Sequence, residues 1–356
     1  MRASDMSETK IESGRKFWSR GNWALWLVLA ATLIILPFLS NSNYFLYSLA
    51  TMVVFAYTGV AWDLLGGRAG QLSLGHSVYF GVGAYSSILL FQHFGFTPWF
   101  SMPIASLLAA GIAFLFFFPT FRFGLVGPFF TLTTIGVAII FELVASNFDA
   151  VGGASGLMTP MKEPGLYWLQ FSDQRAYYFV GLGMLAIVML ISQWVRNSKL
   201  GYQLAAVRGD ESAAEACGIN VGLRKMQITA LSAGLTAIGG VLYAQILTYV
   251  GPPIFGVSMA VAIAVGPIIG GSGWLLGPLV GAALLTAISE TIQLYVGAAV
   301  PGLNLFMYGS LLIFVVLLMP EGIVPRIAQL LGKLRHSGGD AMTRVNVTSK
   351  EQRVVK

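Results

Sequence analysis

Apolar segments long enough to cross a bilayer follow one another from residue 23 to residue 320. A hydrocarbon core about 30 Å thick needs roughly 20 apolar residues in a helix, whose backbone hydrogen bonds are all internal. Only 10% of the residues are charged, whereas soluble domains carry about 25%. The sequence therefore predicts an all-α polytopic membrane protein.

Hydropathy and turn signals divide this region into about ten transmembrane spans. The polar ends, residues 1–22 and 321–356, are expected to be tails. A long mixed loop rich in glycine and proline falls at 147–176, and a long polar stretch includes residues 196–225. The expected spans are residues 23–39, 44–65, 66–91, 98–118, 125–146, 177–195, 226–248, 256–270, 274–296 and 303–319.

The distribution of lysine and arginine predicts which side each loop faces. With ten spans, 19 of the 21 basic residues fall on one side, which also holds both tails and the 196–225 loop. Lys162 and Arg175, in the 147–176 loop, are on the other side. Basic residues are enriched in cytosolic loops. Both tails and the 196–225 loop are therefore expected in the cytosol, and the 147–176 loop outside.

Two glycine-rich segments interrupt the apolar pattern, one in each half of the chain. They are residues 66–85 and 266–281, and the second contains Pro267 and Pro278, which interrupt helical hydrogen bonding. Paired broken helices in corresponding positions are typical of internal repeats around a transport pathway, so a repeat is possible. The four-residue spacing that lets helix backbones approach closely is that of Gly273, Gly277 and Gly281.

The first broken segment carries polar residues at membrane depth, namely Gln71, Ser73, His76 and Ser77. Polar groups there are costly, and they usually line a cavity or a helix interface. These residues are candidates for the translocation path, and packing between helices is the alternative. A helix N-terminus at this point could face an anionic group such as a carboxylate.

The polar stretch from 196 to 228 is the only long one inside the apolar region. Asp210 is a good N-cap residue, a short helix is expected over residues 211–217, and Gly218 suits the position after its end. A capped helix held at the membrane surface by two spans suggests a docking element for a partner. An ordinary solvated loop is the alternative.

The sequence offers little for catalysis or cofactor binding. It has no phosphate-binding loop, no clustered metal ligands and one cysteine, Cys217, so neither an enzyme nor a cofactor is expected. The basic residues form no concentrated stripe for nucleic acid. Glu142 and Glu290 lie inside spans, where an interfacial or interhelix hydrogen bond is the favoured interpretation. Together with His76 they could instead support a proton or ion relay. A stand-alone secondary transporter or channel is therefore a competing class.

Three strings together resemble the LivM-type permease subunit of branched-chain amino acid ABC importers, and the ordered similarity covers about residues 44–320. They are GRAGQLSLGHSVYFGVGAY at 67–85, LGYQLAAVRGDESAAEACGINV at 200–221 and GGSGWLLGPLVGAAL at 270–284.

The wider class of ABC importer permeases has a cytosolic motif that begins Glu-Ala-Ala and ends Leu-Pro. Ser212-Ala213-Ala214, Gly218 and Ile228 fall at its spacing, although serine replaces the glutamate and Ala230-Leu231 replaces Leu-Pro. In the family this helix docks into a cleft of the ATPase. The resemblance thus implies ATPase coupling through Gly201, Asp210, Glu211, Ala213, Ala214 and Gly218.

The resemblance also implies partners and a location. They are a second, LivH-type permease subunit, two ATPase subunits, a substrate-binding protein and the lipid of a bacterial inner membrane. The implied activity is inward transport of branched-chain amino acids. Relatives with nearly the same motifs carry urea or other small amides and acids, so the substrate stays open.

Overall fold

The structure, a computed structural model, describes residues 23–123, 127–296 and parts of 306–327. The chain forms two compact units, and one of them combines residues 1–42 with 325–356. Its described elements are α2 (Trp23–Ile35) and the short 3-10 helix η2 (Leu36–Phe38). Nearly all of both expected tails and most of the expected span 303–319 lie outside the described residues.

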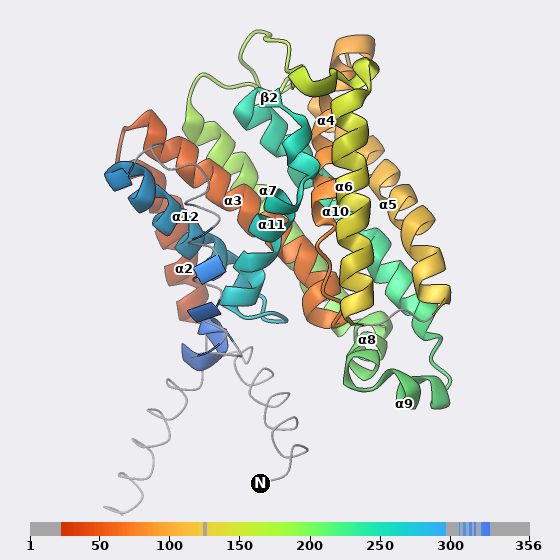
Figure 1. The fold of residues 1–356 in the computed structure, drawn as a ribbon. Helices are drawn as coiled ribbons and strands as arrows, with labels where there is room; N and C mark the ends of the chain where they lie inside the picture. Colours follow the sequence, from red (N-terminus) through yellow and green to blue (C-terminus); the bar gives the residue numbers. More distant parts are fainter. Residues whose placement is uncertain are drawn as a thin grey trace, which may run out of the picture. The chain divides into compact units, whose positions relative to one another are not determined.

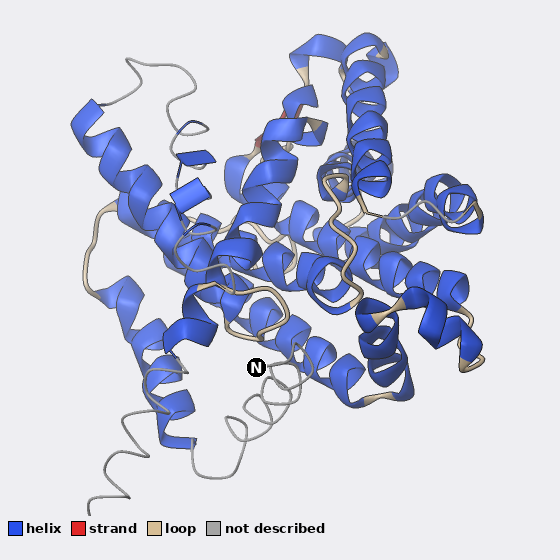
Figure 2. Ribbon diagram, turned by 60° about the horizontal axis from the view of Figure 1, so that its bottom comes forward, coloured by secondary structure: helices blue, strands red, loops and turns tan. Residues whose placement is uncertain are grey.

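The second unit, residues 43–324, contains the remaining elements and all the residues discussed below. Figures 1 and 2 show an almost entirely helical assembly. Its helices are α3 (Asn43–Asp63), the π-helical turn η3 (Leu64–Arg68), α4 (His76–Phe94), α5 (Pro98–Arg122), α6 (Pro128–Asn147), η4 (Asp149–Val151), η5 (Gly153–Ser155), α7 (Gln174–Asn197), α8 (Lys199–Gly209), α9 (Glu211–Ala216), α10 (Val221–Leu247), η6 (Pro252–Phe255), α11 (Val257–Gly270) and α12 (Gly277–Val296).

The helical, membrane-spanning class expected from hydropathy is confirmed. Among the described residues, five helices are long and apolar enough to cross a bilayer: α3 with η3, α5, α6, α7 and α10. Helices α11 and α12 are shorter apolar helices. The total of ten spans stays a prediction.

Helices α3 and α10 form the centre of the unit. Most of each is buried, whereas less than half of α5, α6 and α7 is buried. Helix α10 packs against α3, α4 and α5. The α4 and α10 backbones touch at two glycines, where a side chain would have no room. A Cβ on Gly83 would lie 1.9 Å from the Ala237 carbonyl oxygen, and one on Gly240 would lie 2.0 Å from that of Phe80. Backbone contact of this kind fixes the α4–α10 crossing.

A second close crossing joins α11 to α12. A Cβ on Gly281 would lie 1.8 Å from the Gly266 carbonyl oxygen, and one on Gly277 would lie 2.2 Å from that of Gly271. Gly273 differs from the expectation of three equivalent glycines on one helix face. It lies in the turn before α12 with φ +84°, so it does not share a helix face with Gly277 and Gly281.

The loop of residues 147–176 folds over one end of the unit, opposite α8 and α9 (Figure 1). Its strand β1 (Leu157–Met158) pairs with β2 (Tyr249–Val250), which follows α10. Trp99, next to the start of α5, donates an indole hydrogen bond of 2.8 Å to the Leu166 carbonyl oxygen. The loop is therefore an ordered cap that is bonded to the ends of α5 and α10.

Candidate functional site

Helices α8 and α9 form a small polar module between α7 and α10, here called the α8–α9 module (residues 199–216). Ser198 caps α8 by accepting the Gly201 amide, and a Cβ on Gly201 would lie 2.3 Å from the Val195 carbonyl oxygen. Asp210 caps α9 by accepting the Ala213 amide at 3.0 Å. Gly218 follows α9 at φ +80°, so both predicted ends of this helix are confirmed.

Helix α9 has one buried side and one exposed side. Ala214 is buried against Val207, Val221 and Ile219, so it holds the module together. It does not face outward, as a docking role through its methyl group would require. The residues of α9 that are exposed are Ser212, Ala213, Glu215 and Ala216.

Glu211 connects α9 to two other elements. Its Oε1 atom accepts from Lys225 Nζ, in α10, at 2.6 Å and from Gln71 Nε2 at 3.2 Å. Lys225 is only 3% exposed, and Glu211 is 33% exposed. Gln71 belongs to residues 69–75, the non-helical stretch between η3 and α4, here called the break segment. A predicted coupling residue and a predicted path residue are thus in direct contact.

Arg208 makes a second connection from the module to the membrane domain. Its guanidinium donates to the Gly67 carbonyl oxygen in η3. Four residues earlier, the buried Asp63 carboxylate accepts the Gly273 amide at 2.7 Å. Arg68 and Arg208 both act electrostatically on this carboxylate. The end of α8, the end of α3 and the turn before α12 therefore meet at one charged junction.

His76, the first residue of α4, lies at the centre of a buried hydrogen-bond network. Its Nε2 atom is 2.8 Å from Ser232 Oγ, and its Nδ1 atom is 3.1 Å from Ser73 Oγ. Ser232 donates its only hydroxyl proton to the Ala61 carbonyl oxygen at 2.6 Å. Nε2 must therefore carry the imidazole proton, and Nδ1 accepts from Ser73. The network joins α3, α4 and α10.

Two further bonds, one from the first turn of α4 and one from the break segment, also end on helices. The Ser77 hydroxyl donates to the Phe255 carbonyl oxygen at 2.7 Å. Thr134, in α6, accepts the Leu74 amide at 3.0 Å. All four predicted path residues are at most 5% exposed, and each has a hydrogen-bonding partner. In this conformation they connect helices and do not line an open cavity.

Sequence reasoning missed three residues of this region: Asp63, Arg208 and Lys225. Asp63 offered a signal, because it is the only acidic residue in the 26-residue segment Asn43–Arg68. An ionisable residue within such a segment is a candidate functional residue. Arg208 and Lys225 offered none, since basic residues are common in cytosolic loops.

The remaining titratable candidates lie elsewhere. Glu142, in α6, lies beside Gly256 at the start of α11, where a Cβ would be 2.9 Å from the carboxylate oxygen. Glu290 lies in α12, and its side chain is outside the described residues. Within the part of the chain that the structure describes, no group of three or more His, Cys, Asp or Glu residues could hold a metal ion.

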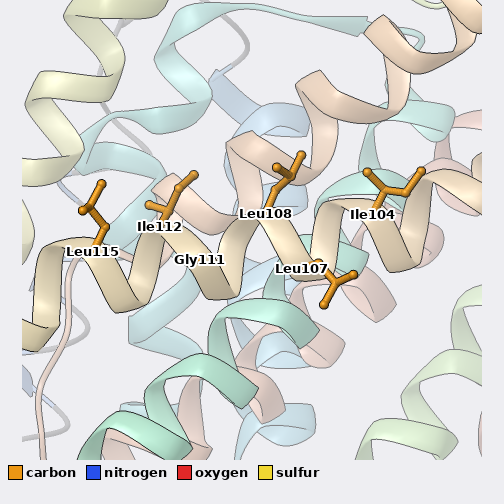
Figure 3. Close-up of a pocket in the computed structure, with 6 residues that line it drawn as sticks. All are labelled: Ile104, Leu107, Leu108, Gly111, Ile112 and Leu115. Atoms are coloured by element: carbon orange, nitrogen blue, oxygen red, sulfur yellow. The ribbon is translucent and has the colours of Figure 1, made fainter.

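An apolar groove of about 430 Å³ runs along the exposed face of α5 (Figure 3). Ile104, Leu108, Ile112 and Leu115 point to one side of the helix, and Leu107 points to the other. Leu107 is 75% exposed. An exposed surface of this composition is expected where a helix faces lipid.

The chain is similar to known transport proteins. The family described as "Branched-chain amino acid transport system / permease component" matches residues 44–316. LivM of Escherichia coli K12, a high-affinity branched-chain amino acid transport system permease protein, is 25% identical over 297 residues, which cover 77% of this chain and 68% of LivM. LivM of Salmonella typhimurium LT2 is 24% identical over 302 residues, which cover 78% of this chain and 69% of that protein.

Another relative, matched over a shorter part of the chain, is named for a different substrate. MglC of Escherichia coli K12, a galactose/methyl galactoside import permease protein, is 27% identical over 201 residues, which cover 54% of this chain and 58% of MglC. No solved structure matches the chain. Since the matched region includes most of the residues, the chain belongs to the family of permease components of branched-chain amino acid transport systems and is an ABC-transporter permease of the LivM type.

Proposed function

We propose that this permease is one of two membrane subunits of an ATP-driven importer that moves branched-chain amino acids or a similar small solute inward. Its partners are a second, LivH-type permease, two ATPase subunits and a substrate-binding protein. Family membership and the two LivM relatives support this proposal.

The observation that carries the proposal is the division of α9 into a buried and an exposed face. Ala214 fixes the helix to the module, while small side chains at Ser212, Ala213 and Ala216 are exposed. A short helix with small exposed residues fits closely into a groove of a partner. The ATPase subunit is the partner that such a surface fits in an ABC permease.

In the proposed mechanism, ATP closes the two ATPase subunits, and their motion displaces the α8–α9 module. That displacement switches access to a path through the membrane, to which a binding protein delivers the solute from outside. This orientation puts both tails and the module in the cytosol and the 147–176 loop outside. The 19-to-2 distribution of basic residues supports it.

Co-purification with the cognate ATPase subunits tests the docking role of α9. Ala213→Arg places a long charged side chain on the exposed face, and we expect it to abolish association while the permease stays in the membrane. Ala213→Ser is the matched control and should co-purify like the wild type. Normal association of the Ala213→Arg variant would overturn the proposed docking surface.

Uptake by vesicles that contain all the subunits tests the substrate. Labelled leucine is expected to accumulate in the vesicles when ATP is supplied. Uptake of labelled urea and of labelled galactose is measured for comparison. Uptake of urea or galactose without leucine would contradict the proposed substrate. Leucine flux at a normal rate through the purified single chain would contradict the importer and favour a stand-alone transporter or channel.

A further inference from the structure

We infer that Arg208 and Glu211 are positioning residues that make residues 63–75 move together with the α8–α9 module. Asp63 then transmits this motion to the turn between α11 and α12. This inference rests on the proposed function, because the ATPase subunits are what would displace the module. It adds the route by which a displacement outside the membrane reaches specific helices inside it.

The first part of the route starts at Arg208, the next-to-last residue of α8. Its guanidinium holds the Gly67 carbonyl oxygen, which belongs to the π-helical turn at the end of α3. A Cβ on Gly67 would lie 2.5 Å from the Gly273 amide nitrogen, so this turn is in backbone contact with the turn before α12. The Asp63 carboxylate, bonded to that same Gly273 amide, fastens the two turns together.

The second part starts at Glu211, the first residue of α9. One carboxylate oxygen holds Gln71 of the break segment and Lys225 of α10. Because Lys225 is buried, moving Glu211 away would leave the lysine charge uncompensated, which is costly. A displaced α9 therefore either carries Gln71 and Lys225 with it or breaks its bonds to them.

The break segment leads directly to the His76 network. Ser73 follows Gln71 by two residues, and its hydroxyl bonds His76, which in turn bonds Ser232 of α10. The Trp62 indole also donates to the Ser73 carbonyl oxygen at 2.7 Å. A shift of Gln71 is therefore transmitted to α3, α4 and α10, the most buried helices of the unit.

Labelling of one introduced cysteine tests the inference. Cys217 is the only cysteine of the chain, so Cys217→Ser gives a background without cysteine. Leu72, next to Gln71 and 44% exposed, is changed to cysteine as the reporter. The rate of maleimide labelling is measured in the complex with its ATPase subunits, without nucleotide and with ATP and vanadate.

We expect nucleotide to change the labelling rate at Leu72→Cys, and we expect that change to be lost in Glu211→Gln and Arg208→Met while the ATPase subunits still co-purify. Arg208→Lys should restore part of the change, because it keeps a positive donor near Gly67. Lys199→Met and Asp149→Asn change exposed charges outside the exposed face of α9 and should behave as the wild type.

Each other outcome counts against the inference in a distinct way. If nucleotide still changes the labelling rate in Glu211→Gln and Arg208→Met, the route is overturned and the proposed function stands. If nucleotide does not change the labelling rate in the wild-type complex, the route is also overturned and the proposed function again stands. Loss of the ATPase subunits from the two variants assigns these residues to docking. A wild-type chain that binds no ATPase subunit overturns the proposed function itself.

Discussion

The carboxylate of Asp63 accepts a hydrogen bond of 2.7 Å from the backbone amide of Gly273, which lies 210 positions further along the chain. This bond joins the end of α3, just before the first glycine-rich segment, to the turn inside the second one. The end of α3 and the turn before α12 are thereby held together, and Arg208 reaches the same place from α8. The two broken segments form one structural unit at the end of the membrane domain that carries the α8–α9 module.

We predict that Asp63→Leu destabilises the protein by about 1–3 kcal/mol, because the half-buried Gly273 amide then loses its acceptor. Asp63→Asn keeps an acceptor oxygen and should be milder. The midpoint of thermal unfolding in detergent measures both effects. Asp149→Leu, at an exposed position, is the control. Equal midpoints for Asp63→Leu and the wild type would show that the bond contributes nothing.

The α4–α10 crossing predicts opposite results for two glycine substitutions. In Gly83→Ala the new Cβ would lie 1.9 Å from the Ala237 carbonyl oxygen, so the helices must separate. Overpacking of this kind costs about 1–3 kcal/mol. Gly183→Ala, in α7, meets nothing within 4 Å and should leave the unfolding midpoint unchanged or slightly raised. A Gly83→Ala variant as stable as Gly183→Ala would argue against the close crossing.

The buried His76 predicts a contrast with His93, which is exposed. His76→Leu removes the partner of both Ser73 and Ser232, and we expect a loss of about 1–3 kcal/mol of stability together with reduced uptake. His93→Leu should change neither quantity. Thermal unfolding and vesicle uptake are measured on the same preparations. Normal stability and uptake of His76→Leu would mean that the network is dispensable.

Much of the architecture could be predicted because it depends on local patterns. Apolar length located α5, α6, α7, α10 and α11 to within a few residues. Cap chemistry located both ends of α9, at Asp210 and Gly218. Glycine and polar residues located the interruptions near 69–75 and 271–276. Each of these features follows from residues that are close together in the chain.

The contacts of the candidate site could not be predicted, because they join residues that are far apart in the chain. Nothing near Asp63 indicates that its partner is Gly273, nor does the sequence around Glu211 point to Gln71. Residues four apart share a face only inside a helix. Gly273 lies in the turn before α12, so its spacing from Gly277 predicts no contact. A helix as short as α9 also has too few residues for its buried face to be visible in a periodic pattern.

The buried position of Ala214 predicts how two neighbouring substitutions differ. Ala214→Arg places a charge among Val207, Val221 and Ile219, where an uncompensated charge costs about 3–5 kcal/mol. We expect this variant to lose both module stability and ATPase association. Ala213→Arg, on the exposed face, should lose only association, because its side chain extends into solvent.

Limited proteolysis of the α8–α9 module, measured beside co-purification, separates the two effects. Faster cleavage between residues 199 and 220 is expected in Ala214→Arg and not in Ala213→Arg. Ala214→Ser adds one small hydroxyl group and serves as the mild control at the buried position. If Ala214→Arg resisted cleavage like the wild type, Ala214 would have to lie on the face that meets the partner, and the division of α9 into a packing face and a docking face would be wrong.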